Sequence, residues 1–173
     1  MAESSRLEDQ PLFENLNAEE LEKLEALMEP ESFEAGEVLI EEDGPEDYLY
    51  VLTSGTVEVS KEVLPGRSQR LATMEAPTVV GEMGLLAEPR AAATVTAKTG
   101  VEARAIPRES LLEKLEAGND AACKVAYQLG RALARRMAET NEAVAGIIVQ
   151  LEEVDPNRDL EIFQDRLMQE WTF

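Results

Sequence analysis

Histidine is absent from the 173 residues of this chain. Its absence excludes catalytic sites of the Ser-His-Asp and Cys-His types, and it excludes metal sites held by imidazole. The single cysteine, Cys123, excludes an internal disulfide framework. Without histidine an enzyme would need paired carboxylates or a catalytic lysine. We therefore expect no enzymatic activity, no catalytic residues, no bound metal and no cofactor.

Long apolar runs and basic residues are also scarce. No stretch of about 18 apolar residues is present, so we expect no membrane span. The acidic N-terminus lacks the apolar core of a secretion signal, which favours a soluble, cytoplasmic protein. Only 16 basic residues accompany 36 acidic ones, giving a formal net charge of −20. Because such a surface repels phosphate backbones, we expect no binding of nucleic acid.

The chain changes its periodicity along its length. Asn17 and Glu20 have the spacing of a capping box, and a short amphipathic helix follows up to Pro30. Between residues 32 and 106, short alternating or apolar runs are separated by Gly and Pro, which indicates an antiparallel sandwich or barrel. The helical period returns from Pro107 onwards. We predict a flexible segment at 1–10, a β domain with flanking helices at 11–118, a long helix at 119–153 and an acidic tail with a short amphipathic helix at 154–173.

The long helix carries apolar residues at alternating spacings of three and four. This seam is typical of a coiled coil and predicts a parallel homodimer. In the tail, an apolar face predicts packing onto the chain's own domain, and docking of an unidentified effector protein is the alternative. The seam comprises Leu129, Leu133, Met137, Val144, Ile147, Ile148 and Leu151, and the tail face comprises Leu160, Phe163, Leu167 and Trp171.

The sequence GEMGLLAEPRAAATV, residues 81–95, combines groups that suit a nucleotide. Gly81 and Gly84 allow a ligand to approach the backbone, and a short helix beginning near Met83 would direct free N–H groups towards a phosphate. Arg90 can hold a phosphate through two N–H bonds. Glu82 repels an anion, and its natural partners are the hydroxyls of a ribose. A glycine turn and a salt-bridged arginine would be the purely structural interpretation of the same residues.

This segment resembles the phosphate-binding cassette of the cyclic-nucleotide-binding domain family, in which G-E-x-x-x-L is followed by P-R-x-A-[TS]-V. The preceding sequence FEAGEVLIEEDGPEDYLYVLTSGTVEVS resembles the first strands of that family, and the resemblance extends from about residue 11 to 148. It implies a mainly β fold with flanking helices: an eight-stranded antiparallel, jelly-roll-like β-roll with a short N-terminal helix and a long C-terminal dimerisation helix. The ligand-binding residues implied in the cassette are Gly81, Glu82, Met83, Gly84, Arg90, Ala91 and Ala92.

The long helix adds a second resemblance. LARRMAETNEAV, residues 133–144, is similar to the dimer helix of the catabolite activator branch of the family. The resemblance implies that Thr140 contacts the purine base and that Asn141 contacts it from the partner subunit. A polar break that sets the register of the seam is the alternative role of Thr140. The residues after 153 are few and acidic, so we expect no helix-turn-helix domain on this chain.

The sequence departs from the family pattern at two places. Arg90 lies nine residues after Gly81, one fewer than usual, and four before Thr94, one more than usual. Either the loop rearranges so that Arg90 still reaches the phosphate, or Ala91 takes the place of the arginine and binding weakens. Glu46 replaces a frequent glycine, and we expect this to alter the turn around it and not the pocket. Ala91 lacks a hydroxyl that would bond guanine, which favours cAMP over cGMP.

Two functions follow as hypotheses. In the first, the chain is a regulatory module that senses cAMP, or less readily cGMP, and shifts its C-terminal helix or a partner on binding. In the second, it is a degenerate, nucleotide-free dimeric scaffold or interaction protein that retains the fold. The two hypotheses differ in whether Arg90, displaced by one residue in the sequence, still reaches a phosphate.

Overall fold

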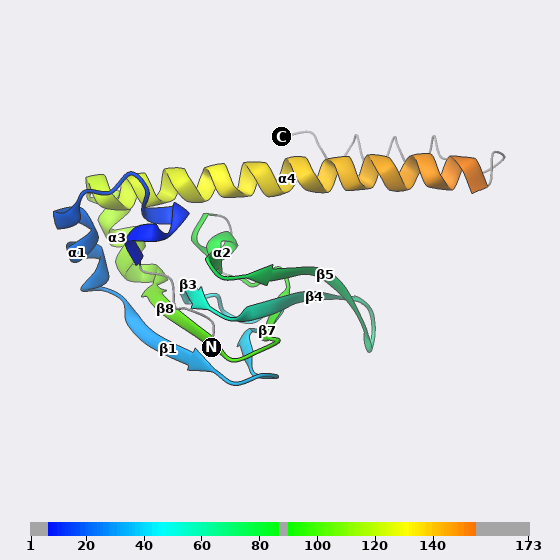
Figure 1. Ribbon diagram of the computed structural model, residues 1–173, viewed down its shortest axis with the longest axis horizontal. Coiled ribbons are helices and arrows are strands. Elements are labelled where there is room, and N and C mark those ends of the chain that lie inside the picture. The colour runs from blue at the N-terminus through cyan, green and yellow to red at the C-terminus, as the bar shows by residue number, and fades with distance from the viewer. Residues whose placement is uncertain (1–6, 87–89, 155–173) are drawn as a thin grey trace. The chain divides into compact units, whose positions relative to one another are not determined.

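The computed structural model describes residues 7–86 and 90–154, with residues 148–154 described by their backbone alone (Figure 1). The chain divides into two compact units, of which one ends at Leu129 and the other begins at Gly130. The predicted tail helix and its apolar face lie outside the described residues. The side chain of Leu151 in the seam also lies outside the described part.

Eight antiparallel strands form two four-stranded sheets within the described residues, which confirms the predicted β-roll. In the first sheet the order is β1-β8-β3-β6, and in the second it is β2-β7-β4-β5. β4 and β5 make the long hairpin seen in Figure 1. The bounds are β1 Glu29–Phe33, β2 Val38–Ile40, β3 Tyr48–Ser54, β4 Thr56–Leu64, β5 Arg67–Glu75, β6 Thr78–Val80, β7 Thr94–Ala97 and β8 Val101–Pro107.

Helices precede the first strand and follow the last strand of the β-roll. α1 begins after a complete capping box, in which Asn17 Oδ1 accepts from the Glu20 amide at 2.9 Å and Glu20 Oε2 accepts from the Asn17 amide at 2.8 Å. This arrangement satisfies two backbone donors at the helix start, as the spacing predicted. The bounds are η1 Leu7–Asp9, η2 Pro11–Phe13, α1 Ala18–Glu25, α2 Glu82–Leu86, α3 Arg108–Glu116 and α4 Asp120–Val154.

Two apolar clusters hold the first unit together. One joins the helices to the outer face of the first sheet, and its members are Leu12, Phe13, Leu24, Leu49, Val51, Val79, Leu85, Ile106, Leu111, Ala122, Val125 and Leu129. The other fills the space between the two sheets, and its members are Leu39, Ile40, Leu52, Val57, Val80, Ala91, Val95, Ala97, Val101 and Ala103. Strand β3 contributes to both clusters, because successive side chains of a strand point to opposite faces.

Two features near the N-terminus differ from the sequence pattern. The polar composition of the first residues gave no sign that Gln10 would be buried, yet its Nε2 donates to the Leu52 carbonyl at 3.2 Å. Pro30 was expected to end the first helix, but α1 ends at Glu25 and Pro30 lies within β1. A proline is tolerated there because β1 is an edge strand of its sheet.

α4 runs without a break from Asp120 to Val154, which confirms the predicted long helix. Met137 and Ile147 of the seam are about half exposed in the single chain. This exposure suits a partner helix, and the homodimer stays a prediction. None of the helices in the described part of the chain combines the length and the apolar character needed to span a lipid bilayer.

The cluster between the sheets should dominate the stability of the first unit. Leu52 is fully buried in this cluster, whereas Leu64 in the β4–β5 hairpin is 56% exposed. We expect Leu52→Ala to lower the free energy of unfolding by about 3 kcal/mol, because it leaves a cavity. The matched control, Leu64→Ala, should cost less than about 1 kcal/mol. Urea unfolding followed by circular dichroism measures both, and equal losses would contradict this assignment of the core.

Candidate functional site

The candidate site is the segment of residues 81–95, called the cassette here. It leaves the first sheet at the end of β6, passes Gly81 and forms the five-residue helix α2, which begins at Glu82, one residue before the predicted start. Residues 87–89 lie outside the described residues. The segment resumes at Arg90 and enters β7 at Thr94.

Gly81 fixes the direction in which the chain enters α2. Its φ is +89°, a conformation that residues with a side chain rarely adopt. A Cβ at this position would also collide with the carbonyl oxygen of Tyr48. The position therefore requires glycine for two independent reasons. The resulting turn places Glu82 at the start of α2 with only 6% of its surface exposed.

Gly84 is required by a different neighbour. A Cβ built on Gly84 would lie 2.5 Å from Oε2 of Glu46 and 2.6 Å from its Cβ, closer than real side chains approach. The Glu46 side chain thus lies directly against the backbone of α2. Glu46 was expected to affect the turn around it, and its side chain also contacts the cassette at Gly84. Its effect on a ligand stays a prediction. Met83, between the two buried residues, is 46% exposed.

The second half of the cassette forms backbone hydrogen bonds with the turn that contains Glu46. The Ala91 amide donates to the Gly44 carbonyl at 3.0 Å, and the Asp43 amide donates to the Ala91 carbonyl at 2.9 Å. A further bridge joins Pro45 to Arg90. Residues 43–47, called the clamp turn here, therefore contact the cassette on both sides of residues 87–89.

Arg90 and Ala91 lie on opposite sides of this pairing. Arg90 is exposed, and its Nη1 donates to the Asp43 carbonyl at 3.1 Å. Ala91 is 2% exposed and belongs to the cluster between the sheets. Ala92 is exposed, and its carbonyl accepts from Nζ of Lys61 at 2.6 Å. Within the β-roll, the inward position at this point of the cassette is thus held by alanine.

The charges around Glu46 are unbalanced. Burial raises the pKa of Glu46 above its ordinary value, and the nearby Glu82 carboxylate raises it further. The Gly84 amide and Arg108 oppose this rise. Oε2 of Glu46 is buried and has no hydrogen-bond partner among the described residues. Two buried carboxylates, Glu46 of the clamp turn and Glu82 of the cassette, therefore lie close together beside α2.

Arg108 is a site residue that the sequence did not reveal. It is the first residue of α3, and its Nε donates to the Gly84 carbonyl at 2.5 Å, while its amide donates to the Asp47 carbonyl at 2.8 Å. It thereby fixes α2 against the clamp turn. A cation in the first turn of a helix opposes the helix dipole. This unfavourable placement was the signal that Arg108 serves another element.

The model of the family described as "Cyclic nucleotide-binding domain" matches residues 30–117, about half of the chain. The chain belongs to the cyclic nucleotide-binding domain family. Glutaminase 1 of Bradyrhizobium diazoefficiens is 33% identical over 142 residues, which are 82% of this chain and 22% of the relative. The CRP-like cAMP-activated global transcriptional regulator of Mycobacterium tuberculosis is 26% identical over 137 residues, which are 79% of this chain and 59% of the relative.

Among solved structures, the catabolite activator protein of Thermus thermophilus aligns with a TM-score of 0.67 and 27% identity. The alignment covers 79% of this chain and 62% of that one. This chain therefore spans less than two thirds of each of these three relatives.

The two predicted base contacts of this domain lie in the second unit. The hydroxyl of Thr140 is exposed and donates to the Arg136 carbonyl at 2.8 Å, one helical turn earlier. Asn141 is half-buried. Both residues belong to the unit that begins at Gly130, whereas the cassette belongs to the unit that ends at Leu129. The base contacts and the alternative role of Thr140 in the seam both stay predictions.

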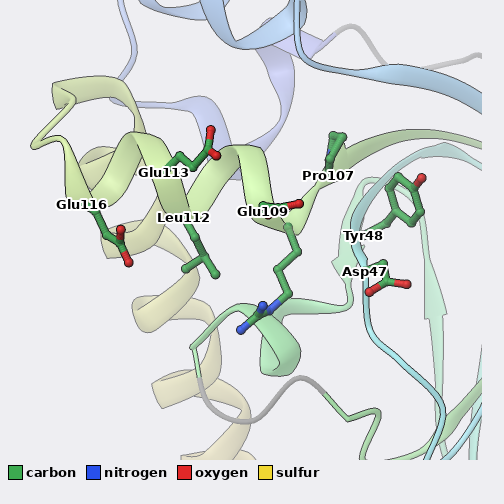
Figure 2. A pocket seen from close by; sticks show the side chains of 8 residues that line it. Asp47, Tyr48, Pro107, Glu109, Leu112, Glu113 and Glu116 are labelled. Carbon is green, nitrogen blue, oxygen red and sulfur yellow. The ribbon is translucent and has the colours of Figure 1, made fainter.

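A separate groove of about 640 Å³ lies between the start of β3 and α3 (Figure 2). Figure 2 shows Asp47, Glu109, Glu113 and Glu116 around it, with Tyr48, Pro107 and Leu112. Arg108 also lines the groove, so four carboxylates accompany a single arginine, and this excess of negative charge makes an anionic ligand unfavourable there. Within the described ranges, no group of three or more His, Cys, Asp and Glu side chains is placed to hold a metal ion.

The raised pKa of Glu46 predicts how stability depends on pH. A carboxyl group whose pKa is higher in the folded chain binds more protons folded than unfolded, so its contribution falls as the pH rises from about 4.3. Glu46→Gln cannot ionise, and its melting temperature relative to the wild type should increase between pH 5 and pH 8. Glu109→Gln, which removes an exposed charge from α3, is the control. A constant difference between Glu46→Gln and wild type over this range would contradict a raised pKa.

Proposed function

We propose that this chain is a regulatory module that binds a cyclic nucleotide, with cAMP favoured over cGMP and without catalysis. The observation that carries the proposal is the placement of Glu82, a buried carboxylate directly after Gly81 in a chain of this family. An ionised carboxylate accepts several hydrogen bonds, and the hydroxyls of a ribose can donate to it. The name of the Mycobacterium tuberculosis relative, a cAMP-activated regulator, supports the same ligand.

In this proposal each half of the cassette has its own contacts with the ligand. Glu82 holds the sugar beside the close backbone approach that Gly81 and Gly84 allow, and the N–H groups at the start of α2 around Met83 face the phosphate. Arg90 holds the phosphate through its guanidinium and Ala92 through its amide, while the small Ala91, whose amide is bonded to the Gly44 carbonyl, leaves room for it. The buried Ala91 offers no hydroxyl to a guanine, which supports the preference for cAMP. Thr140 would contact the base, and Asn141 would do so from the second subunit of a homodimer.

The output of the module would be a shift of the helix at 119–153 relative to the ligand-binding part at 11–118. A nucleotide that binds one arrangement of this helix more tightly shifts the population towards it. The half-exposed Met137 and Ile147 support a homodimer through this helix. We further propose that the effector is another protein and not nucleic acid, since the chain carries a net charge of −20.

A second candidate function is a nucleotide-free dimeric scaffold. The observation that favours it is the pair Arg90 and Ala91. The guanidinium of Arg90 is bonded to the Asp43 carbonyl, and the inward position belongs to a buried methyl group. A phosphate bound at Ala91 would have no cation of its own, and the Ala91 amide is already bonded to the Gly44 carbonyl.

Isothermal titration with cAMP and cGMP tests the proposal. We expect dissociation constants in the micromolar range, with cAMP the tighter ligand. Arg90→Ala should weaken binding at least about tenfold, because a charge-assisted bidentate contact is lost. Arg67→Ala, which removes an exposed arginine at the start of β5, is the matched control and should leave the affinity unchanged. The absence of heat and of any thermal shift with both nucleotides would favour the scaffold.

A further inference from the structure

Glu46 introduces a charge into the cassette from outside it. The residue belongs to the clamp turn, but its side chain lies against Gly84, and a Cβ on Gly84 would come within 2.7 Å of three of its atoms. No side chain can therefore separate the Glu46 carboxylate from the backbone of α2. The carboxylate is held in place by this contact, since only 6% of the residue is exposed.

The Oε2 atom of Glu46 is an unsatisfied acceptor. It is buried, and the described part of the chain gives it no hydrogen-bond partner. An unpaired buried acceptor is costly, and in native proteins such an atom marks the place of a proton, a water molecule or a ligand group. Here that place adjoins the turn that carries Glu82. The unpaired oxygen thus indicates that a proton, a water molecule or a ligand group binds to Glu46 at the candidate site.

Among the described residues, neither Arg108 nor Arg90 forms an ion pair with Glu46. Arg108 acts on Glu46 electrostatically, but its Nε is bonded to the Gly84 carbonyl. Arg90 is exposed and bonded to the Asp43 carbonyl. Glu82, the nearest buried charge from α2, has the same sign as Glu46. An anionic phosphate that entered the cassette would therefore approach two buried carboxylates, and charges of like sign repel strongly in a medium of low dielectric constant.

We propose that Glu46 is a specificity-determining residue that opposes the binding of an anionic nucleotide, so that this domain binds cyclic nucleotides only weakly while Glu46 carries its charge. This inference rests on the proposed function, because it concerns the same cassette. It adds Glu46, a residue outside the cassette sequence, to the residues that determine nucleotide binding. It also explains how a domain can retain the Gly81–Glu82 turn and still have a low affinity for its ligand.

Removing the charge of Glu46 tests this inference. Glu46→Gln keeps the shape of the side chain, and we expect it to raise the affinity for cAMP at least about tenfold at pH 7, measured by isothermal titration. Adenosine, which has no phosphate, should bind wild type and Glu46→Gln equally. Glu109→Gln removes an exposed carboxylate from α3 and should change the affinity for cAMP less than about twofold. Circular dichroism confirms that each variant is folded.

The outcomes separate this inference from the proposed function. Equal affinities of wild type and Glu46→Gln for cAMP would overturn the inference and leave the proposed function standing, and so would a parallel gain for adenosine. Binding by Glu46→Gln alone would support the inference and favour the scaffold for the native chain. No binding by either would overturn both. If Glu46→Gln does not fold, Glu46→Ala removes the same charge and also uncovers Gly84.

Discussion

The contact between the clamp turn and the cassette is the constraint on which the candidate site depends. Asp43 and Gly44 exchange backbone hydrogen bonds with Ala91, and Glu46 packs against Gly84. Both halves of the cassette are thus positioned by one short segment that is distant in the sequence. A change in this turn therefore acts on both described halves of the cassette, and through Ala91 it also reaches the apolar cluster between the sheets.

The fold and the chemistry of the site have separate physical origins in this chain. The β-roll is stabilised by two apolar clusters, to which the described residues of the cassette contribute Leu85, Ala91 and Val95. Among the described residues, by contrast, the charges at the cassette are carried by Glu82 and Arg90 of the cassette and by Glu46 of the clamp turn. Substitutions that shift these charges therefore leave the fold recognisable while they change what can bind. This separation is why membership in the cyclic nucleotide-binding domain family does not by itself determine the ligand.

The sequence predicted those parts of the structure that leave a local signal. The alternation at Leu49 to Leu52 and the capping box at Asn17 led to the correct elements, because both are set by nearby residues. β1 was missed since it is polar, contains Pro30 and is held by its partner β8. The roles of Glu46 and Arg108 arise from contacts across 38 and 24 positions of the sequence with Gly84. Periodicity cannot reveal such contacts.

The strong acidity of the chain and an anionic ligand are physically compatible. At physiological ionic strength, exposed charges are screened beyond about 8 Å, so most of the 36 acidic side chains have little effect on a ligand in the cassette. Screening fails for buried groups, because water and salt are excluded around them. Glu46 and Glu82 are each 6% exposed and adjoin the same turn of α2. If the cassette binds a phosphate as proposed, these two carboxylates and Arg90 therefore affect its affinity more than the net charge of the chain does.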